Sequence, residues 1–229
     1  MLDVLVVAPH PDDAELGMAG SILKLKQEGL RVGVLDLTSG EPTPHGSEEI
    51  RREETANATQ LLQLDVRENL GLPNRSLKAD LDSRYKLAGF IRRARPRWLF
   101  APYWVDAHPD HVAAAELVEA ARFWAKLSKT DLPGAPWHPE RIFHYFSIHL
   151  RLAIQPAFVV DISQHWSQKL QTINCYQSQF AMGPRGESPT FLHQLESEAS
   201  YWGKSIGTAH GEPFACKEPV GLSGFGRLI

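Results

Sequence analysis

The chain has 229 residues, of which 43% are hydrophobic and 22% are charged, and its formal net charge is −3. This is the composition of a folded globular protein, and the charge balance gives no reason to expect nucleic acid or an anionic membrane as a partner. The apolar runs are too short to cross a bilayer, and no signal-peptide pattern opens the chain. We therefore expect one cytoplasmic domain over residues 1–229.

Short apolar runs alternate with amphipathic segments along the chain. The run 4–7 predicts a strand, and residues 13–28 predict a helix because their apolar positions follow helical spacing. Further strands are expected at 32–37, 66–70, 98–101, 142–148 and 158–162, and further helices at 47–64, 81–94, 109–124, 163–179 and 190–206. Strands that alternate with helices predict a mainly parallel sheet with helices on both faces. The expected fold is α/β, a single Rossmann-like domain of three layers.

A polar string, His-Pro-Asp-Asp, follows the first strand at residues 10–13. His10 and Asp13 offer an imidazole and a carboxylate three residues apart, and such ligands suit a divalent ion such as Zn²⁺. Asp12 lies beside them without being needed as a ligand, which is the placement of a general base. The alternative is that Asp12 or Asp13 only caps the following helix, a common role of aspartate.

A second polar string, Asp-Ala-His-Pro-Asp-His at residues 106–111, follows the strand at 98–101 and begins a helix. His108 and His111 lie one helical turn apart, so both can face the same side. His111 can complete a three-ligand set with the two ligands of the first string, which leaves an open position as in catalytic zinc sites. Asp110 is the expected orienting partner of His108. The alternative is a polar helix start in which one histidine donates to a carbonyl.

Together the two strings resemble the motifs of the LmbE/PIG-L family of zinc-dependent N-deacetylases. The similarity lies in Ala-Pro-His-Pro-Asp-Asp-Ala-Glu-Leu-Gly at 8–17 and in His-Pro-Asp-His at 108–111, with further similar blocks at 36–41, 51–54, 69–75 and 101–103. The segments 176–180 and 211–214 are similar to those of the bacillithiol-pathway branch. Enzymes of that branch remove the acetyl group from N-acetylglucosaminyl-malate.

This resemblance implies a ligand set and a base. It implies that His10, Asp13 and His111 bind Zn²⁺ and that Asp12 is the general base. The expected reaction is hydrolysis of the N-acetyl group of a small amino-sugar substrate, which gives acetate and a free amine. The resemblance also implies a homo-oligomer, because members of the bacillithiol branch are often hexameric.

The resemblance further implies that His108 is the cation that stabilises the oxyanion and that Asp110 holds it. Arg51 matches the family's substrate-binding arginine, whereas the alternative is a solvated helix charge beside glutamates. Two positions depart from the bacillithiol branch. Ala107 stands where that branch commonly has an arginine, and His210 stands where an aromatic hydroxyl is common. The cationic contact to a carboxylated substrate is therefore missing or supplied elsewhere.

Several functions stay open from the sequence. The deacetylated substrate is N-acetylglucosaminyl-malate or another N-acetylated amino-sugar conjugate. A metal-dependent phosphoesterase would use the same ligands, but it needs a cationic cluster, of which the sequence shows only Arg51 and Arg52. A metal- or sugar-binding protein without turnover is the third function, and it predicts that Asp12 is dispensable.

The remaining histidines lack ligand-type neighbours at useful spacing. His45 alone lies in a loop that follows a strand end and could overhang the site. The others are expected to have no role in the site: His138, His144, His149, His165 and His193.

Overall fold

The computed structural model describes residues 1–149, 153–180, 190–222, 224 and 229. Its strands are β1 (Val4–Ala8), β2 (Val32–Asp36), β3 (Val66–Asn69), β4 (Trp98–Pro102), β5 (Arg141–Tyr145), β6 (Phe158–Asp161) and β7 (Gly211–Ala215). They form a sheet of order β3-β2-β1-β4-β5-β7-β6 within the described residues. The first five strands pair in parallel, whereas β7 is antiparallel to both β5 and β6. The predicted α/β class with a mainly parallel sheet is confirmed.

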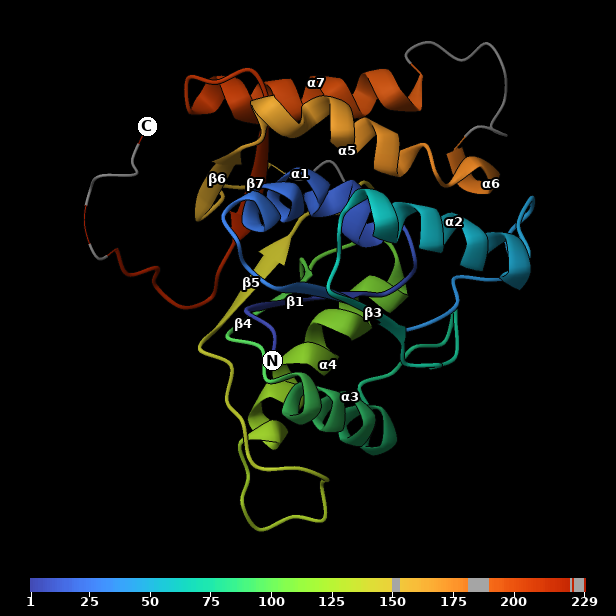
Figure 1. Cartoon of the computed structure of the whole chain (residues 1–229), viewed down its shortest axis with the longest axis vertical. Coiled ribbons are helices and arrows are strands. Elements are labelled where there is room, and N and C mark those ends of the chain that lie inside the picture. Colours follow the sequence, from blue (N-terminus) through green and yellow to red (C-terminus); the bar gives the residue numbers. More distant parts are fainter. Residues whose placement is uncertain (150–152, 181–189, 223, 225–228) are drawn as a thin grey trace.

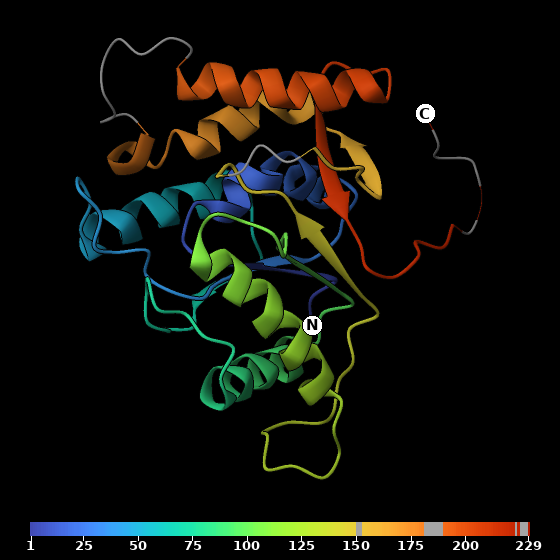
Figure 2. The ribbon, with the colours of Figure 1, turned by 180° about the vertical axis from the view of Figure 1, so that it is seen from behind.

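Helices cover both faces of this sheet (Figure 1). They are α1 (Asp13–Gln27), α2 (Glu48–Leu61), α3 (Leu81–Ala94), α4 (Pro109–Ala125), the 3-10 helix η1 (Ser163–His165), α5 (Trp166–Ile173), α6 (Gln177–Phe180) and α7 (Phe191–Ser205). One face packs against α3 and α4, and the other packs against α1. Figures 1 and 2 show α5 and α7 beyond α1, and a third apolar cluster joins them to it. The three predicted layers therefore carry an additional outer layer of helices.

The core follows from the alternation of side chains along the strands. In β1 the side chains of Leu5 and Val7 belong to the cluster beneath α3 and α4, whereas those of Val4 and Val6 belong to the cluster beneath α1. Both sets are fully buried, as expected for a parallel sheet covered on both faces. No helix in the described part of the chain is long and apolar enough to cross a bilayer.

Helix starts follow the capping signals of the sequence. Ser47 is the N-cap of α2, and its hydroxyl accepts the N–H of Ile50 at 3.2 Å. Asp80 caps α3 in the same way through the N–H of Ser83 at 2.9 Å. Pro109 occupies the first turn of α4, where its missing N–H leaves no hydrogen bond unmade.

The C-terminal half differs from the predicted elements in two ways. The helix expected over 163–179 is divided into η1, α5 and α6, with a turn at Asn174–Cys175. The strand β7 was not expected, and it is held in part by a contact that is distant in sequence. The carboxylate of Glu212 in β7 accepts the N–H groups of Gly20 and Ser21, just after the non-helical residue Met18 in α1.

Candidate active site

The two polar strings meet at the carboxyl edge of the sheet. The first follows β1 and leads into α1, and the second follows β4 and leads into α4. Since β1 and β4 are parallel neighbours, their carboxyl ends lie side by side. Ligands bind at this edge in open α/β sheets. The fold thus brings together residues that are about a hundred positions apart in the sequence.

His10, Asp13 and His111 form a compact group at this edge. The His10 Nδ1 atom lies 3.1 Å from Asp13 Oδ2, and the His111 Nε2 atom lies 3.3 Å from Asp13 Oδ1. One ligand-type atom from each residue lies within 4.8 Å of those of the other two. Asp13 and His111 are buried, and His10 is half-buried. The structure therefore places together the three residues that were predicted as metal ligands.

The chemistry of this group fits a divalent cation. His111 Nε2 is buried, and no hydrogen-bond partner for it lies among the described residues. Burial alone would lower the pKa of His111, but the carboxylates of Asp13 and Asp106 raise it to about 10. A cation could take the place of a proton on His111 Nε2, which lies 3.3 Å from Asp13 Oδ1, because metal ligands must be deprotonated. Two imidazoles and one carboxylate are a donor set that zinc accepts.

A second group of ligand-type atoms overlaps the first. His10, His108 and Asp110 also lie within 4.8 Å of one another. The Asp110 carboxylate, however, already accepts the N–H of Arg75 at 2.7 Å and that of Leu77 at 3.1 Å. Because these hydrogen bonds use both of its oxygens, the group that contains His111 fits a cation better.

The expected pairing of the Asp110 carboxylate with His108 is wrong. That carboxylate lies 3.2 Å from His10 Nε2, because the loop that carries Arg75 fixes it there. The contact with His108 is made by the backbone, since the N–H of Asp110 donates to His108 Nδ1 at 3.2 Å. Burial and the imidazoles of His10 and His111 lower the pKa of His108. These contacts favour a neutral His108 ring with its proton on Nε2, in place of the expected cation.

Asp12 is the N-cap residue of α1, but its carboxylate is used elsewhere. It occupies the N-cap position of α1 with a φ of 117°, and its side chain makes no capping hydrogen bond. Its carboxylate instead accepts from Arg51 Nη1 at 3.0 Å. The alternative is therefore right about the position of Asp12 at the helix start, but the carboxylate itself does not cap the helix. Burial and the charge of Asp13 raise the pKa of Asp12 to about 7, against the opposite effect of Arg51. A carboxylate with this pKa can both take and return a proton near neutral pH.

Arg51 is buried and ion-paired, so the alternative of a solvated helix charge is wrong. Besides Asp12, its guanidinium contacts Glu41 Oε1 at 3.2 Å and donates to the carbonyl of Pro11 at 2.6 Å. These contacts fix the orientation of the Asp12 carboxylate. A role of Arg51 in substrate binding stays a prediction.

A cavity of about 260 Å³ opens above these residues. We call its two parts the inner end, formed by His10, Asp12, Asp13, His108 and His149, and the outer wall, which includes Thr43, Asn74, Arg75, Ile148, Gln179 and Phe180.

Four positions singled out in the sequence have clear places relative to this cavity. His149 was expected to have no role, but it lines the inner end, and its ring lies 5.0 Å from that of His111. His149 directly follows the strand that the sequence predicted over 142–148, and this position could have indicated that it lies near the site. His45 is exposed and does not line the cavity, and Ala107 is likewise exposed outside it. His210 stacks on Trp166 at 4.6 Å, also away from the cavity lining.

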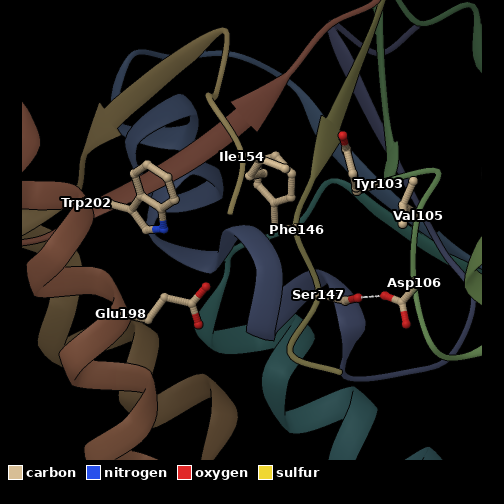
Figure 3. Close-up of a pocket in the computed structure, with 8 residues that line it drawn as sticks. All are labelled: Tyr103, Val105, Asp106, Phe146, Ser147, Ile154, Glu198 and Trp202. Atoms are coloured by element: carbon tan, nitrogen blue, oxygen red, sulfur yellow. Dashed lines mark hydrogen bonds between the residues drawn. The ribbon is translucent and has the colours of Figure 1, made fainter. Parts of the chain in front are cut away.

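Asp106 and Ser147 support His111 from behind and had no role in the sequence prediction. His111 Nδ1 lies 3.1 Å from Asp106 Oδ2 and 3.2 Å from Ser147 Oγ. Figure 3 shows the Ser147 hydroxyl directed at the Asp106 carboxylate, in a small pocket that also includes Glu198 and Trp202 of α7. These contacts turn Nε2 of His111 toward Asp13, as outer carboxylates do for metal-bound histidines. Asp106 stands in the second polar string, but Ser147 is visible only in the fold.

Several known proteins are similar to this chain in sequence. It is 29% identical to the diacetylchitobiose deacetylase of Thermococcus kodakarensis, over 91% of this chain and 80% of that protein. It is 26% identical to the probable N-acetyl-alpha-D-glucosaminyl L-malate deacetylase 2 of Bacillus anthracis, over 78% and 81%. It is also 26% identical to the 4-oxalmesaconate hydratase of Pseudomonas putida, over 76% and 73%.

A solved structure and a family profile extend these matches. The crystal structure of the conserved protein TT1542 from Thermus thermophilus superposes with a TM-score of 0.91 at 43% identity, and the match covers 99% of this chain and 100% of that one. The profile of the PIG-L family, described as GlcNAc-PI de-N-acetylase, matches residues 5–122, which include both polar strings. Since this match covers more than half of the sequence, the chain belongs to the PIG-L family of de-N-acetylases and is an enzyme.

Proposed function

We propose that this enzyme is a zinc-dependent hydrolase that removes the N-acetyl group from a small N-acetylglucosaminide. The observation that carries the proposal is the arrangement of the inner end. His10, Asp13 and His111 are grouped as a donor set, and Asp12, which is not one of the three, lies beside them with a pKa raised to about 7. A binding protein without turnover would not need this second, separately held carboxylate.

In the proposed mechanism, His10, Asp13 and His111 hold the cation. A bound divalent ion supplies a Lewis acid that polarises the acetyl carbonyl and makes water more acidic. Asp12 takes the proton of the attacking water on its carboxylate, which the Arg51 guanidinium keeps in place. The same carboxylate then returns the proton to the departing amine, so acetate and a free amino sugar are formed.

His108 acts as a hydrogen-bond donor in this mechanism. Its Nδ1 accepts the N–H of Asp110, so the neutral ring carries its proton on Nε2. From the inner end of the cavity, this N–H can donate to the oxyanion that develops when the acetyl carbon becomes tetrahedral. Donors of this kind contribute about 2.7–4 kcal/mol to the barrier in well-studied hydrolases. A positive charge on His108 is not required.

For the substrate we propose N-acetylglucosaminyl-malate, as in bacillithiol biosynthesis. The relative from B. anthracis supports this choice by name, whereas the relative from T. kodakarensis is named for diacetylchitobiose. The similarity at residues 176–180 also supports it, because Gln179 and Phe180 lie in the outer wall of the cavity. Another N-acetylated amino-sugar conjugate is the alternative.

The test is direct. The purified protein, stripped of metal with a chelator and reloaded with Zn²⁺, is incubated with N-acetylglucosaminyl-malate or N,N′-diacetylchitobiose. Released acetate and new primary amine are then measured in parallel. We expect equal amounts of both products, and none from the stripped protein. Failure of the reloaded protein to release acetate from either compound would exclude the proposed function.

A hydratase is the second candidate, because one relative is named as a hydratase at an identity close to that of the malate deacetylase. Both reactions add water to an unsaturated carbon, and a metal site with a carboxylate base suits either. The two are distinguished by their products, since a hydratase releases no acetate and consumes a carbon–carbon double bond. Loss of the ultraviolet absorbance of 4-oxalmesaconate, without any deacetylation, would favour the hydratase.

A further inference from the structure

The outer wall of the cavity contains a cation that the proposed mechanism does not use. Arg51 and Arg75 both line the cavity, but they differ in their partners. Arg51 is buried between Asp12 and Glu41. Arg75 is exposed, and its guanidinium donates to the carbonyl of Pro42, while no carboxylate in the described part of the chain pairs with it. Its positive charge is therefore available to a ligand.

The backbone of Arg75 is held in an unfavourable conformation. Its φ is 62°, in the left-handed region that few residues other than glycine adopt. Two hydrogen bonds fix it there, because its N–H donates to Asp110 Oδ2 at 2.7 Å and to Asn74 Oδ1 at 3.0 Å. The Asp110 carboxylate also contacts His10, so Arg75 is anchored to the inner end of the cavity. Backbone strain that is fixed in this way is common at ligand-binding sites.

We propose that Arg75 binds a carboxylate on the part of the substrate that lies away from the acetamide, so that the enzyme prefers anionic conjugates. The inference rests on the proposed deacetylase function and deepens it. The forked donors of a guanidinium match the two oxygens of a carboxylate. The carboxylates that line the cavity, Asp12 and Asp13, lie at its inner end, whereas Asn74 and Gln179 near Arg75 are neutral. An anionic group at the outer wall therefore meets a cation, with neutral side chains around it and the carboxylates of the lining at the other end.

This role would replace the cationic contact that Ala107 cannot make. The two relatives named as deacetylases differ in this respect, because malate carries carboxylates and diacetylchitobiose carries none. The position of Arg75 therefore favours the conjugate with a carboxylated aglycone, independently of the overall identity to either relative.

The test compares two substrates that share the same sugar. N-acetylglucosaminyl-malate is anionic, and methyl N-acetyl-α-D-glucosaminide is neutral. Arg75→Asn removes the charge with a residue that tolerates the left-handed conformation. We expect it to lower kcat/KM for the malate conjugate about 10- to 100-fold, mainly through KM, and to change the methyl glycoside by less than about twofold. Arg75→Lys should recover part of the loss.

Arg95→Asn is the matched control. Arg95 is also an exposed arginine with a left-handed φ, of 51°, but it caps α3 and does not line the cavity. This control should leave both substrates unaffected. Equal losses of the two substrates in Arg75→Asn, or no loss of either, would overturn the inference.

A failure of the proposed function itself would look different, since the unmodified enzyme would then release acetate from neither substrate. In that case, calorimetry with N-acetylglucosaminyl-malate decides the inference. Binding that is about tenfold or more weaker in Arg75→Asn would support it. Equal dissociation constants, or no binding to the unmodified protein, would overturn it.

Discussion

The inner end and the outer wall of the cavity are built in different ways. At the inner end Asp13 is buried, as are its neighbours Arg51 and His111, and each is held by charged or hydrogen-bonding partners. At the outer wall, Arg75 is exposed and pairs with no carboxylate among the described residues. The difference indicates that the reaction is determined by a fixed, buried network, whereas the choice of substrate depends on side chains that a ligand itself must engage.

The largest effect should follow from removing His111, one of the three proposed metal ligands. His111→Ala leaves the carboxylates of Asp13 and Asp106 without the imidazole that lies between them. We expect the variant to bind less than one equivalent of metal and to lose measurable deacetylation. Elemental analysis of the purified variant tests this, with the exposed His193→Ala as the control. A full equivalent of metal in His111→Ala would remove His111 from the ligand set.

Removing the proposed base, Asp12, should abolish most of the catalysis without affecting metal binding. Asp12→Asn preserves the size of the side chain and tolerates the φ of 117°, so the loss of the carboxylate is the main change. We expect kcat to fall by about two to four orders of magnitude, the range of a positioned acid–base group. The metal content should stay at the level of the unmodified enzyme. Near-normal turnover by this variant would favour a binding protein or another base.

A smaller effect, on metal affinity, is expected from changing Asp106, which contacts the ligand His111. Asp106→Asn weakens the orientation of the ligand ring, and outer carboxylates of this type change metal affinity about 10- to 100-fold. Competition with a chromophoric chelator measures the affinity without any substrate. Ser147→Ala should shift it in the same direction by less, because the carboxylate contact remains.

Asp161→Asn provides the matched control for Asp106→Asn. Asp161 also accepts a serine hydroxyl and a backbone N–H, both from Ser163, but it lies outside the cavity lining. An unchanged metal affinity in Asp106→Asn, or an equal loss in the control, would show that Asp106 does not position His111.

The sequence was sufficient for the parallel half of the fold and for the residues that follow its strands. The ligand set and Asp12 could be predicted because each polar string stands directly after a short apolar run. In a parallel sheet, that position alone brings such residues to one edge. The antiparallel strand β7 could not be predicted in this way. Its segment contains Pro213 within five residues, and its pairing with β5 and β6 depends on the tertiary fold.

The hydrogen-bond partners of the site residues could not be predicted from local sequence patterns. Asp110 was expected to hold His108, but the N–H groups of Arg75 and Leu77, more than thirty residues away, fix its carboxylate beside His10 instead. Ser147 follows β5, and nothing in its neighbourhood identifies it as a partner of Asp106. Contacts of this kind arise from loops that meet only in the folded chain.

The smallest effect should come from adding a cation beside the outer wall. Ala107 is exposed and does not line the cavity, so an arginine there would act on the substrate through solvent. Exposed charge pairs contribute up to about 1 kcal/mol, which corresponds to about a fivefold change in KM. We expect Ala107→Arg to lower KM for N-acetylglucosaminyl-malate within this limit, to lose the gain at high salt, and to leave free N-acetylglucosamine unchanged. If Ala107→Arg changed KM for N-acetylglucosaminyl-malate by a larger factor than Arg75→Asn does, the substrate carboxylate would lie near position 107 and Arg75 would not bind it. Steady-state kinetics of the two single variants and of their combination distinguish these arrangements, because the added arginine should only partly replace Arg75 in the double variant.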